Sequence, residues 1–270
     1  MNTPRLALLI ALASLPIAVR ADVIITLEEP QGHSILSFEG TKVRIDHFSG
    51  SGPAKVSVIF DGSARVLYQL DPANKVATRL DEASGKQVAA RMREAMERAE
   101  AGMTPEQRTR FEAAMGHGQG DAQSNKPHVW KFERASGSET VAGYRCDRFR
   151  VIDNGNPTEE GCFIPWSAGA VQKPDLVAFQ EMGKFVENIM SSLRSSATRG
   201  PQESSNERIA MWFDQAPGFP AVIAHLNPDG KSTRIVKLQK IERATVPADR
   251  FRVPPGYREE SAAEKMGTHQ

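Results

Sequence analysis

The stretch from Phe38 to Leu80 constrains the fold most, because its apolar residues recur at every second position between short turn-like segments. The alternating positions are Val43, Ile45, Val56, Val58, Phe60, Val66, Tyr68, Leu70, Val76 and Leu80. Period-two alternation is typical of strands with one buried and one exposed face. Turn-forming residues at 60–63 and 71–74 join consecutive runs closely, so the pattern predicts an antiparallel meander.

Strand patterns also occur on both sides of this meander. Before it, residues 23–27 and 33–38 flank a Pro-Gln-Gly turn. After it, strand character is found at 128–132, 141–144, 209–213, 221–226 and 233–241. An extended segment, 246–257, closes the domain, and residues 259–270 are expected to form a disordered tail.

Two regions change to a helical period. Residues 86–101 carry apolar side chains every three or four positions, and Thr104, Pro105 and Gln107 have the pattern of a cap, a first helical residue and a capping box. We therefore predict a helical hairpin insert at 86–115, followed by a flexible Gly-rich loop at 116–127. A longer helix, 174–193, has the best-formed apolar face and should pack across the sheet. The fold class is α+β with about ten antiparallel strands.

The first residues have the features of a secretory signal peptide. Arg5 precedes an apolar run that is too short, and interrupted by Ser14 and Pro16, for a membrane span. We expect export to the periplasm with cleavage near Ala21, leaving a single domain over 22–258. No later apolar run reaches membrane-spanning length, so no transmembrane segment is expected in the mature chain.

Charge argues against a nucleic-acid partner. The formal net charge of the whole chain is +1, and it becomes −1 once Arg5 and Arg20 are removed with the signal peptide. A nearly neutral chain of mixed sign lacks the basic surface that nucleic-acid binding requires.

The two cysteines, Cys146 and Cys162, both lie in the exported part, where an even pair predicts a disulfide. Asp153, Asn154 and Gly155 fit a three-residue hairpin loop between them, and counting outward from that loop places the cysteines opposite each other. A redox or metal-binding pair lacks the CxxC spacing and a nearby histidine.

No pattern indicates catalysis or a cofactor. The six histidines are scattered without metal-ligand spacing, so no metal is expected. Gly230-Lys231-Ser232 lacks the upstream glycine of a phosphate-binding loop and is better interpreted as a hairpin turn. A hydrolase is a distant third hypothesis, because no nucleophile, base and orienting group could be assembled. We expect no enzyme activity.

The chain resembles a family of bacterial exported proteins, domain of unknown function 4412, which in turn is similar to the periplasmic lipoprotein carriers and receptors of the Lol system. The resemblance is carried by four segments: 38–46, 59–62 with 67–72, 141–146 and 251–257. It implies a strongly curved antiparallel half-barrel wrapped over a long helix, with an apolar concavity. In the carriers that concavity holds acyl chains.

The first functional hypothesis is therefore a non-catalytic, carrier-like protein that binds a lipid or a hydrophobic peptide. The predicted lining of its pocket is Val43, Ile45, Val58, Phe60, Tyr68, Leu70, Phe179, Met182, Val186 and Ile189. The methionines of the helical regions, Met92, Met96, Met103, Met115, Met182 and Met190, fit either a pocket or an ordinary core. The alternative is an envelope interaction or scaffold module with a filled core, which binds another envelope protein through the helical insert.

Overall fold

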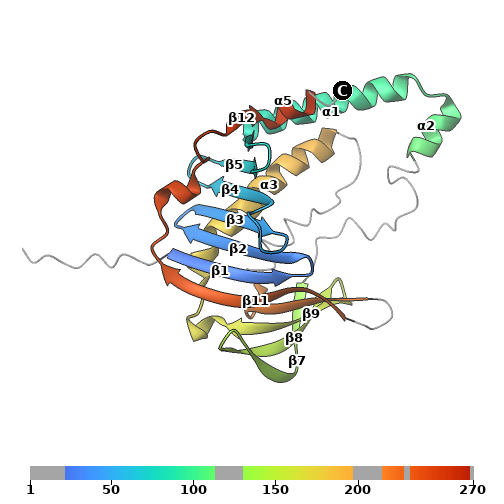
Figure 1. The fold of residues 1–270 in the computed structure, drawn as a ribbon. Coiled ribbons are helices and arrows are strands. Elements are labelled where there is room, and N and C mark those ends of the chain that lie inside the picture. The colour runs from blue at the N-terminus through green and yellow to red at the C-terminus, as the bar shows by residue number, and fades with distance from the viewer. Residues whose placement is uncertain (1–21, 113–129, 197–214, 228–231, 268–270) are drawn as a thin grey trace, which may run out of the picture.

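The computed structural model describes residues 22–112, 130–196, 215–227 and 232–267. Three sequence predictions lie outside these residues: the signal peptide at 1–21, the flexible loop at 116–127 and the strand at 209–213. The described residues are built on one curved, unclosed sheet with a few helices, which confirms the α+β class (Figure 1).

The sheet has twelve strands rather than about ten, in the order β12-β6-β5-β4-β3-β2-β1-β11-β10-β9-β8-β7. Neighbouring strands are antiparallel except β12 and β6, which are parallel. The strands are β1 (Asp22–Glu29), β2 (Gly32–Glu39), β3 (Lys42–Phe48), β4 (Val56–Asp61), β5 (Val66–Asp71), β6 (Val76–Leu80), β7 (Trp130–Val141), β8 (Tyr144–Asp153), β9 (Asn156–Pro165), β10 (Gly218–Leu226), β11 (Ser232–Ala244) and β12 (Arg258–Ser261).

The predicted meander is present as β3–β6, and side-chain hydrogen bonds fix two of its turns. Asp61 Oδ1 accepts from the backbone N–H groups of Ser63 and Ala64, at 2.9 and 3.1 Å. Asp71 Oδ1 accepts from the backbone N–H of Asn74 at 3.1 Å. Such Asx turns explain why short polar segments reverse the chain at these two points.

Helix α1 (Glu82–Ala101) begins four residues before the predicted start because Asp81 caps it. Asp81 Oδ1 accepts from the Ser84 N–H at 2.7 Å, and Ser84 Oγ accepts from the Asp81 N–H at 2.9 Å. Helix α2 (Pro105–Glu112) has the predicted capping box: Thr104 Oγ1 accepts from the Gln107 N–H and Gln107 Oε1 from the Thr104 N–H. These reciprocal bonds satisfy N–H groups that the first turn leaves without partners.

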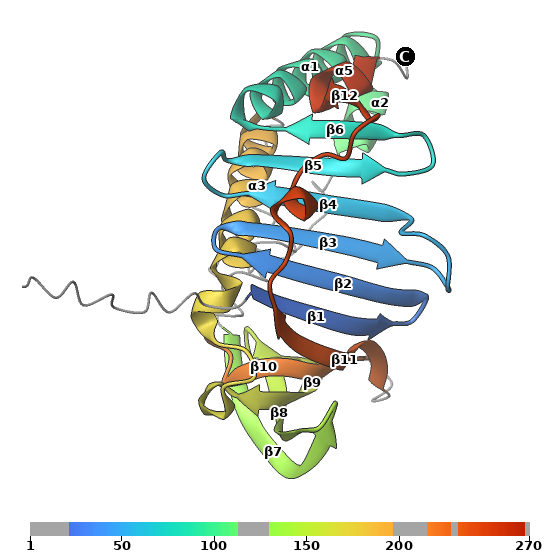
Figure 2. The same cartoon turned by 60° about the vertical axis from the view of Figure 1, so that its left-hand side comes forward.

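The predicted long helix is α3 (Val177–Ser196), preceded by two short 3-10 segments, η2 (Trp166–Ala168) and η3 (Lys173–Leu176). It runs along one end of strands β1–β6, against the face that we call the α3 face (Figure 2). Arg243 of β11 anchors its start by donating to Asp175 Oδ2 at 2.7 Å. Toward the C-terminal end of α3, Ile189 packs closely on Gly85 of α1. A Cβ atom at position 85 would be only 3.0 Å from Ile189 Cγ2.

The segment after β11 crosses the opposite face of the sheet, which we call the C-terminal face (Figure 2). It includes η4 (Ala248–Phe251), and its Val253 and Tyr257 pack on a cluster of Ile59, Leu70 and Ala77. The chain then forms β12 and α5 (Ala262–Gly267), so the predicted disordered tail is wrong for residues 259–267. The reason is a long-range contact, since the Arg258 N–H donates to the carbonyl of Lys75.

Cys146 and Cys162 form the predicted disulfide, with 5.3 Å between their Cα atoms. The hairpin around them differs from the prediction. Its loop is the two-residue turn Asn154-Gly155, with positive φ at both positions, and a register shift follows Val151. Arg148, not Cys146, is therefore the residue opposite Cys162. The disulfide joins a diagonal rather than a directly opposed pair.

Candidate binding site on the sheet

Strand register arranges the side chains of the α3 face in three rows that run across the strands. Row one consists of Val23, Phe38, Val43, Phe60, Leu67 and Leu80. Row two consists of Ile25, Leu36, Ile45, Val58, Gln69 and Thr78. Row three begins with Leu27, Ser34, His47 and Val56. On each strand, the residues of successive rows are two positions apart, because every second side chain points to the same face.

Row one lies beneath α3 and forms a closed core. Val43 and Phe60 are buried, and so are Phe185 and Ile189 of the helix. The rings of Phe60 and Phe185 are 5.4 Å apart between centroids. The helix therefore fills the part of the sheet face that it covers.

Beyond α3 the apolar residues of rows two and three are only partly covered. We call this group the apolar strip: Leu27, Leu36, Ile45, Val56 and Val58. Its members lie on four adjacent strands, β1 to β4, and their register makes them neighbours across those strands. Leu27, Leu36 and Ile45 also pack in part against the core, so the strip continues that core toward solvent. A contiguous apolar patch of this kind is one of the features that mark binding sites for apolar partners.

Three polar side chains end the strip, and we call them the polar cluster: Glu29, Ser34 and His47. Ser34 Oγ donates to Glu29 Oε1 at 2.5 Å and lies 2.6 Å from His47 Nδ1. Glu29 Oε2 is 3.7 Å from the same ring nitrogen. Ser34 is 1% exposed, whereas the side chain of His47 is 46% exposed. The cluster was not predicted from the sequence, because only the register of three strands brings it together.

The cluster differs from the serine–histidine–carboxylate site of a hydrolase. In such a site one imidazole nitrogen contacts the serine and the other contacts the carboxylate. Here serine and carboxylate both face Nδ1, and the serine is buried. The arrangement orients an imidazole but does not present a nucleophile.

The structure separates the predicted lining residues into four groups, of which three are on the α3 face. Ile45 and Val58 belong to the apolar strip, while Val43, Phe60 and Ile189 are buried core. Phe179, Met182 and Val186 are half-buried on α3 and pack against that core.

Tyr68 and Leu70 are on the C-terminal face, so their predicted place in the pocket is wrong. Leu67 is opposite Phe60 in the register, which puts its neighbour Tyr68 on the other side of the sheet. There Tyr68 and Leu70 pack with Val253 and Tyr257.

Helix α1 extends beyond the sheet and exposes part of its apolar face. Gly85 packs on α3, and Arg91 donates to the Ala263 carbonyl of α5. Past these contacts, Met92 is 44% exposed, with Ala95 and Ala99 exposed one and two turns further on. Met92 is therefore neither pocket lining nor core. Met182 is half-buried against the core, and Met103 is partly exposed. The side chains of Met96, Met115 and Met190 lie outside the described residues.

A separate cleft of about 270 Å³ lies beside the disulfide. Its wall includes Glu139, Arg148, Arg150, Glu160 and Val222, and Arg148 donates to Glu139 Oε1 at 3.4 Å. Glu139 also forms a group with both cysteine sulfurs within 4.8 Å, but those sulfurs are joined to each other and are not thiolate ligands for a metal.

Shifted pKa values occur at turns and caps. The pKa of Asp71 is lowered by hydrogen bonds from the side chain and backbone of Asn74. The pKa of Asp81 is lowered by the backbone N–H of Ser84. Both shifts follow from hydrogen bonds to the ionised carboxylate and have a structural explanation.

Comparison with known proteins places the chain in a family. The model of the domain of unknown function DUF4412 matches residues 106–257, which is more than half of the chain. The chain belongs to the DUF4412 family. The match runs from α2 to the end of the segment that crosses the C-terminal face, so β1–β6 lie outside it. No curated protein matches the sequence.

Three solved structures show a distant likeness to this chain. An uncharacterized conserved protein from Thermus thermophilus is 6% identical, with a TM-score of 0.43 over 90% of this chain and 91% of that one. MucB of Pseudomonas aeruginosa, in complex with MucA, is 9% identical with a TM-score of 0.33 over 86% of this chain. A structure of MucB with MucA(peri) gives the same identity and TM-score over 87% of this chain. This chain spans about half of the MucB chains (55%). Likenesses this distant carry no functional conclusion.

None of the helices in the described residues is long and apolar enough to cross a membrane. The disulfide indicates an extracytoplasmic protein, because such bonds persist in oxidising compartments.

Proposed function

We propose that this DUF4412 protein is a non-catalytic, periplasmic binding or carrier-like protein that holds an apolar chain on the α3 face of its sheet. The observation that supports it is the apolar strip, five aliphatic side chains on four adjacent strands that α3 leaves half-exposed. Because row one is packed, the ligand lies beside α3 rather than beneath it.

The strip is large enough to give useful affinity. Covering apolar surface gains about 25 cal/mol per Å². A chain that covers roughly 200 Å² of the strip therefore gains about 5 kcal/mol before the entropic costs of binding. Micromolar affinity then requires additional contacts, such as a polar head group can supply.

The test is binding of a fluorescent apolar probe, 1-N-phenylnaphthylamine, and its displacement by dodecyl compounds. In the double variant Ile45→Thr, Val58→Thr, the change at Val58 keeps side-chain shape and the change at Ile45 removes one methyl group. Both changes place a hydroxyl group against the ligand. Burying an unpaired hydroxyl costs about 1–3 kcal/mol, so we expect affinity to fall at least roughly tenfold.

The control is Ile235→Thr, because Ile235 is 41% exposed and lies on β11, outside the three rows. It should bind the probe like the wild type. The proposal is wrong if the folded wild-type protein binds no apolar probe, or if the double variant and the wild type bind equally well.

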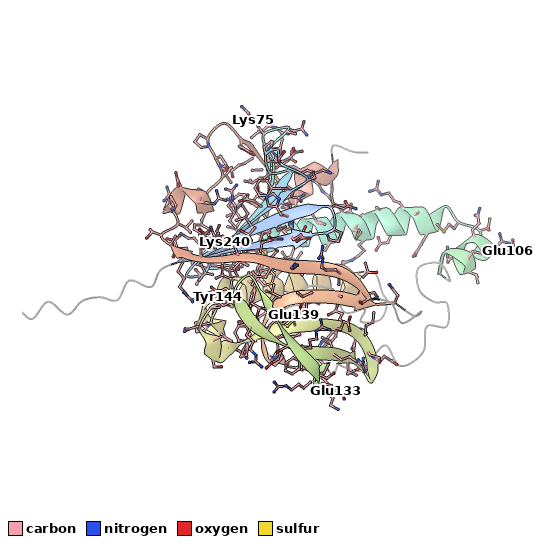
Figure 3. All side chains as sticks on the ribbon, turned by 60° about the horizontal axis from the view of Figure 1, so that its bottom comes forward. Lys75, Glu106, Glu133, Glu139, Tyr144 and Lys240 are labelled. Atoms are coloured by element: carbon pink, nitrogen blue, oxygen red, sulfur yellow. A yellow bond between two sulfur atoms is a disulfide. The ribbon has the colours of Figure 1, made fainter. Side chains whose placement is uncertain are left out.

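A second candidate function is supported by the exposed face of α1, which extends away from the sheet together with α2. Figure 3 shows Glu106 of α2 far from Glu139 and Tyr144, which lie at the β7–β8 end of the sheet. A protruding helix with Met92 exposed could dock on another envelope protein.

Site-specific photo-crosslinking tests this second candidate. A photoreactive residue at position 92 should give a crosslinked envelope protein in cells. The same residue at Glu97, which is exposed and lies on the opposite side of α1 by helical geometry, should give little product. Equal yields at the two positions exclude the apolar face of α1 as the contact surface.

A further inference from the structure

The polar cluster holds a histidine in one tautomer beside the apolar strip. Ser34 has a single hydroxyl proton, and it donates that proton to Glu29, because an ionised carboxylate can only accept. At its 2.6 Å contact with His47 Nδ1, Ser34 Oγ must then accept. The proton of a neutral imidazole therefore sits on Nδ1, and Nε2 carries the lone pair.

The free nitrogen points away from the serine. The two nitrogens lie on different sides of the ring, so with Nδ1 at buried Ser34, Nε2 is on the outer part of a side chain that is 46% exposed. No side chain in the described ranges forms a hydrogen bond to Nε2. A ligand can therefore reach this acceptor.

The acceptor and the strip share one face of the sheet. His47 is directly opposite Val56, and Ile45, two residues earlier on β3, is on the same face. The polar cluster also carries the negative charge of Glu29, whose side chain is 36% exposed. A hydrogen-bond acceptor beside a carboxylate favours a donor and disfavours an anion.

We propose that the ligand is a single-chain amphiphile whose head group donates a hydrogen bond to His47 Nε2, while its hydrocarbon chain lies on the apolar strip. A hydroxyl or an ammonium head group fits this chemistry, and a carboxylate does not. This inference rests on the proposed function, because it assigns the polar end of the same site.

Matched dodecyl ligands test the inference at pH 8.5. Dodecanol should displace the probe roughly three- to tenfold more effectively than dodecyl methyl ether, which has the same chain but no donor. Dodecylammonium should bind at least as tightly as dodecanol, and dodecanoate more weakly. In His47→Phe the alcohol and the ether should become equivalent.

His33→Phe is the matched control. His33 precedes Ser34 on β2, so it faces the other side of the sheet, where its ring stacks on Phe48 at 4.5 Å. This variant should keep the preference for dodecanol. Ser34→Ala should weaken the preference, because it removes the link that orients the imidazole.

The outcomes separate the two proposals. If none of the dodecyl ligands displaces the probe, the proposed function itself fails. If the wild type binds dodecanol and the ether equally, or prefers dodecanoate, the head-group assignment fails while the apolar site stands. Tighter binding of an apolar peptide than of dodecanol also contradicts the head-group assignment.

Discussion

Replacing Asp46 with alanine should lower the free energy of unfolding by about 3–5 kcal/mol, because it removes the acceptor from a buried charge network. The side chain of Asp46 is 3% exposed on the C-terminal face. It accepts from Arg44 Nε at 2.8 Å, from Ser57 Oγ at 2.5 Å and from Arg250 Nη2 at 2.8 Å. Without the carboxylate, two guanidinium groups face each other without their counter-ion. Urea unfolding with the disulfide intact measures the loss.

The same change should loosen the segment that crosses the C-terminal face, since Arg250 lies on η4 and joins it to β3 through Asp46. Limited proteolysis should then cut faster after Ala244. Asp249→Ala is the control on that segment, because Asp249 is exposed, and its unfolding free energy should stay within about 0.5 kcal/mol of the wild type. An Asp46→Ala protein as stable as this control contradicts the role given to the network.

Local sequence signals predicted the elements well where neighbouring residues decide the structure. Alternation located β3–β6, and the Thr104–Gln107 pair located the start of α2. The pairing of Cys146 with Cys162 was also predictable, because a short hairpin joins the two cysteines. In each case the deciding contacts are only a few residues apart in the chain.

Errors arose where one residue of register decides which face a side chain occupies. The apolar series Val66, Tyr68 and Leu70 suggested the pocket face, but Leu67 is the residue that pairs with Phe60. Both faces of this part of the sheet are covered, so alternation alone does not indicate which face holds α3. The diagonal position of the disulfide has the same kind of cause, a two-residue turn with a register shift.

Long-range contacts were not predictable from one sequence. The pairing of Arg258 with Val76 and the bond between Arg250 and Asp46 join residues far apart in the chain. The candidate site depends on both local sequence patterns and long-range contacts. Ile45 and Val58 follow from alternation, whereas Glu29, Ser34 and His47 meet only through the register of β1, β2 and β3.

Phe185→Ala should have the second large effect on stability. Its result also distinguishes an α3 that is a fixed part of the core from an α3 that moves to open a binding site. Phe185 is 2% exposed and packs against Phe60, and the guanidinium carbon of Arg65 lies over its ring, 6.0 Å from the centroid. Truncating such a buried ring removes its transfer free energy and leaves a cavity, which costs about 3–5 kcal/mol. Chemical unfolding measures this, and Val186→Ala, at a half-buried neighbour, should cost clearly less.

The result also bears on where the ligand lies. If row one is core and the ligand lies on the apolar strip, Phe185→Ala lowers stability while dodecanol affinity stays within roughly threefold of the wild type under conditions where the variant is folded. If α3 instead opens to admit a chain beneath it, removing its largest buried side chain costs little stability and raises affinity. The second pattern contradicts a closed row one and moves the binding site under the helix.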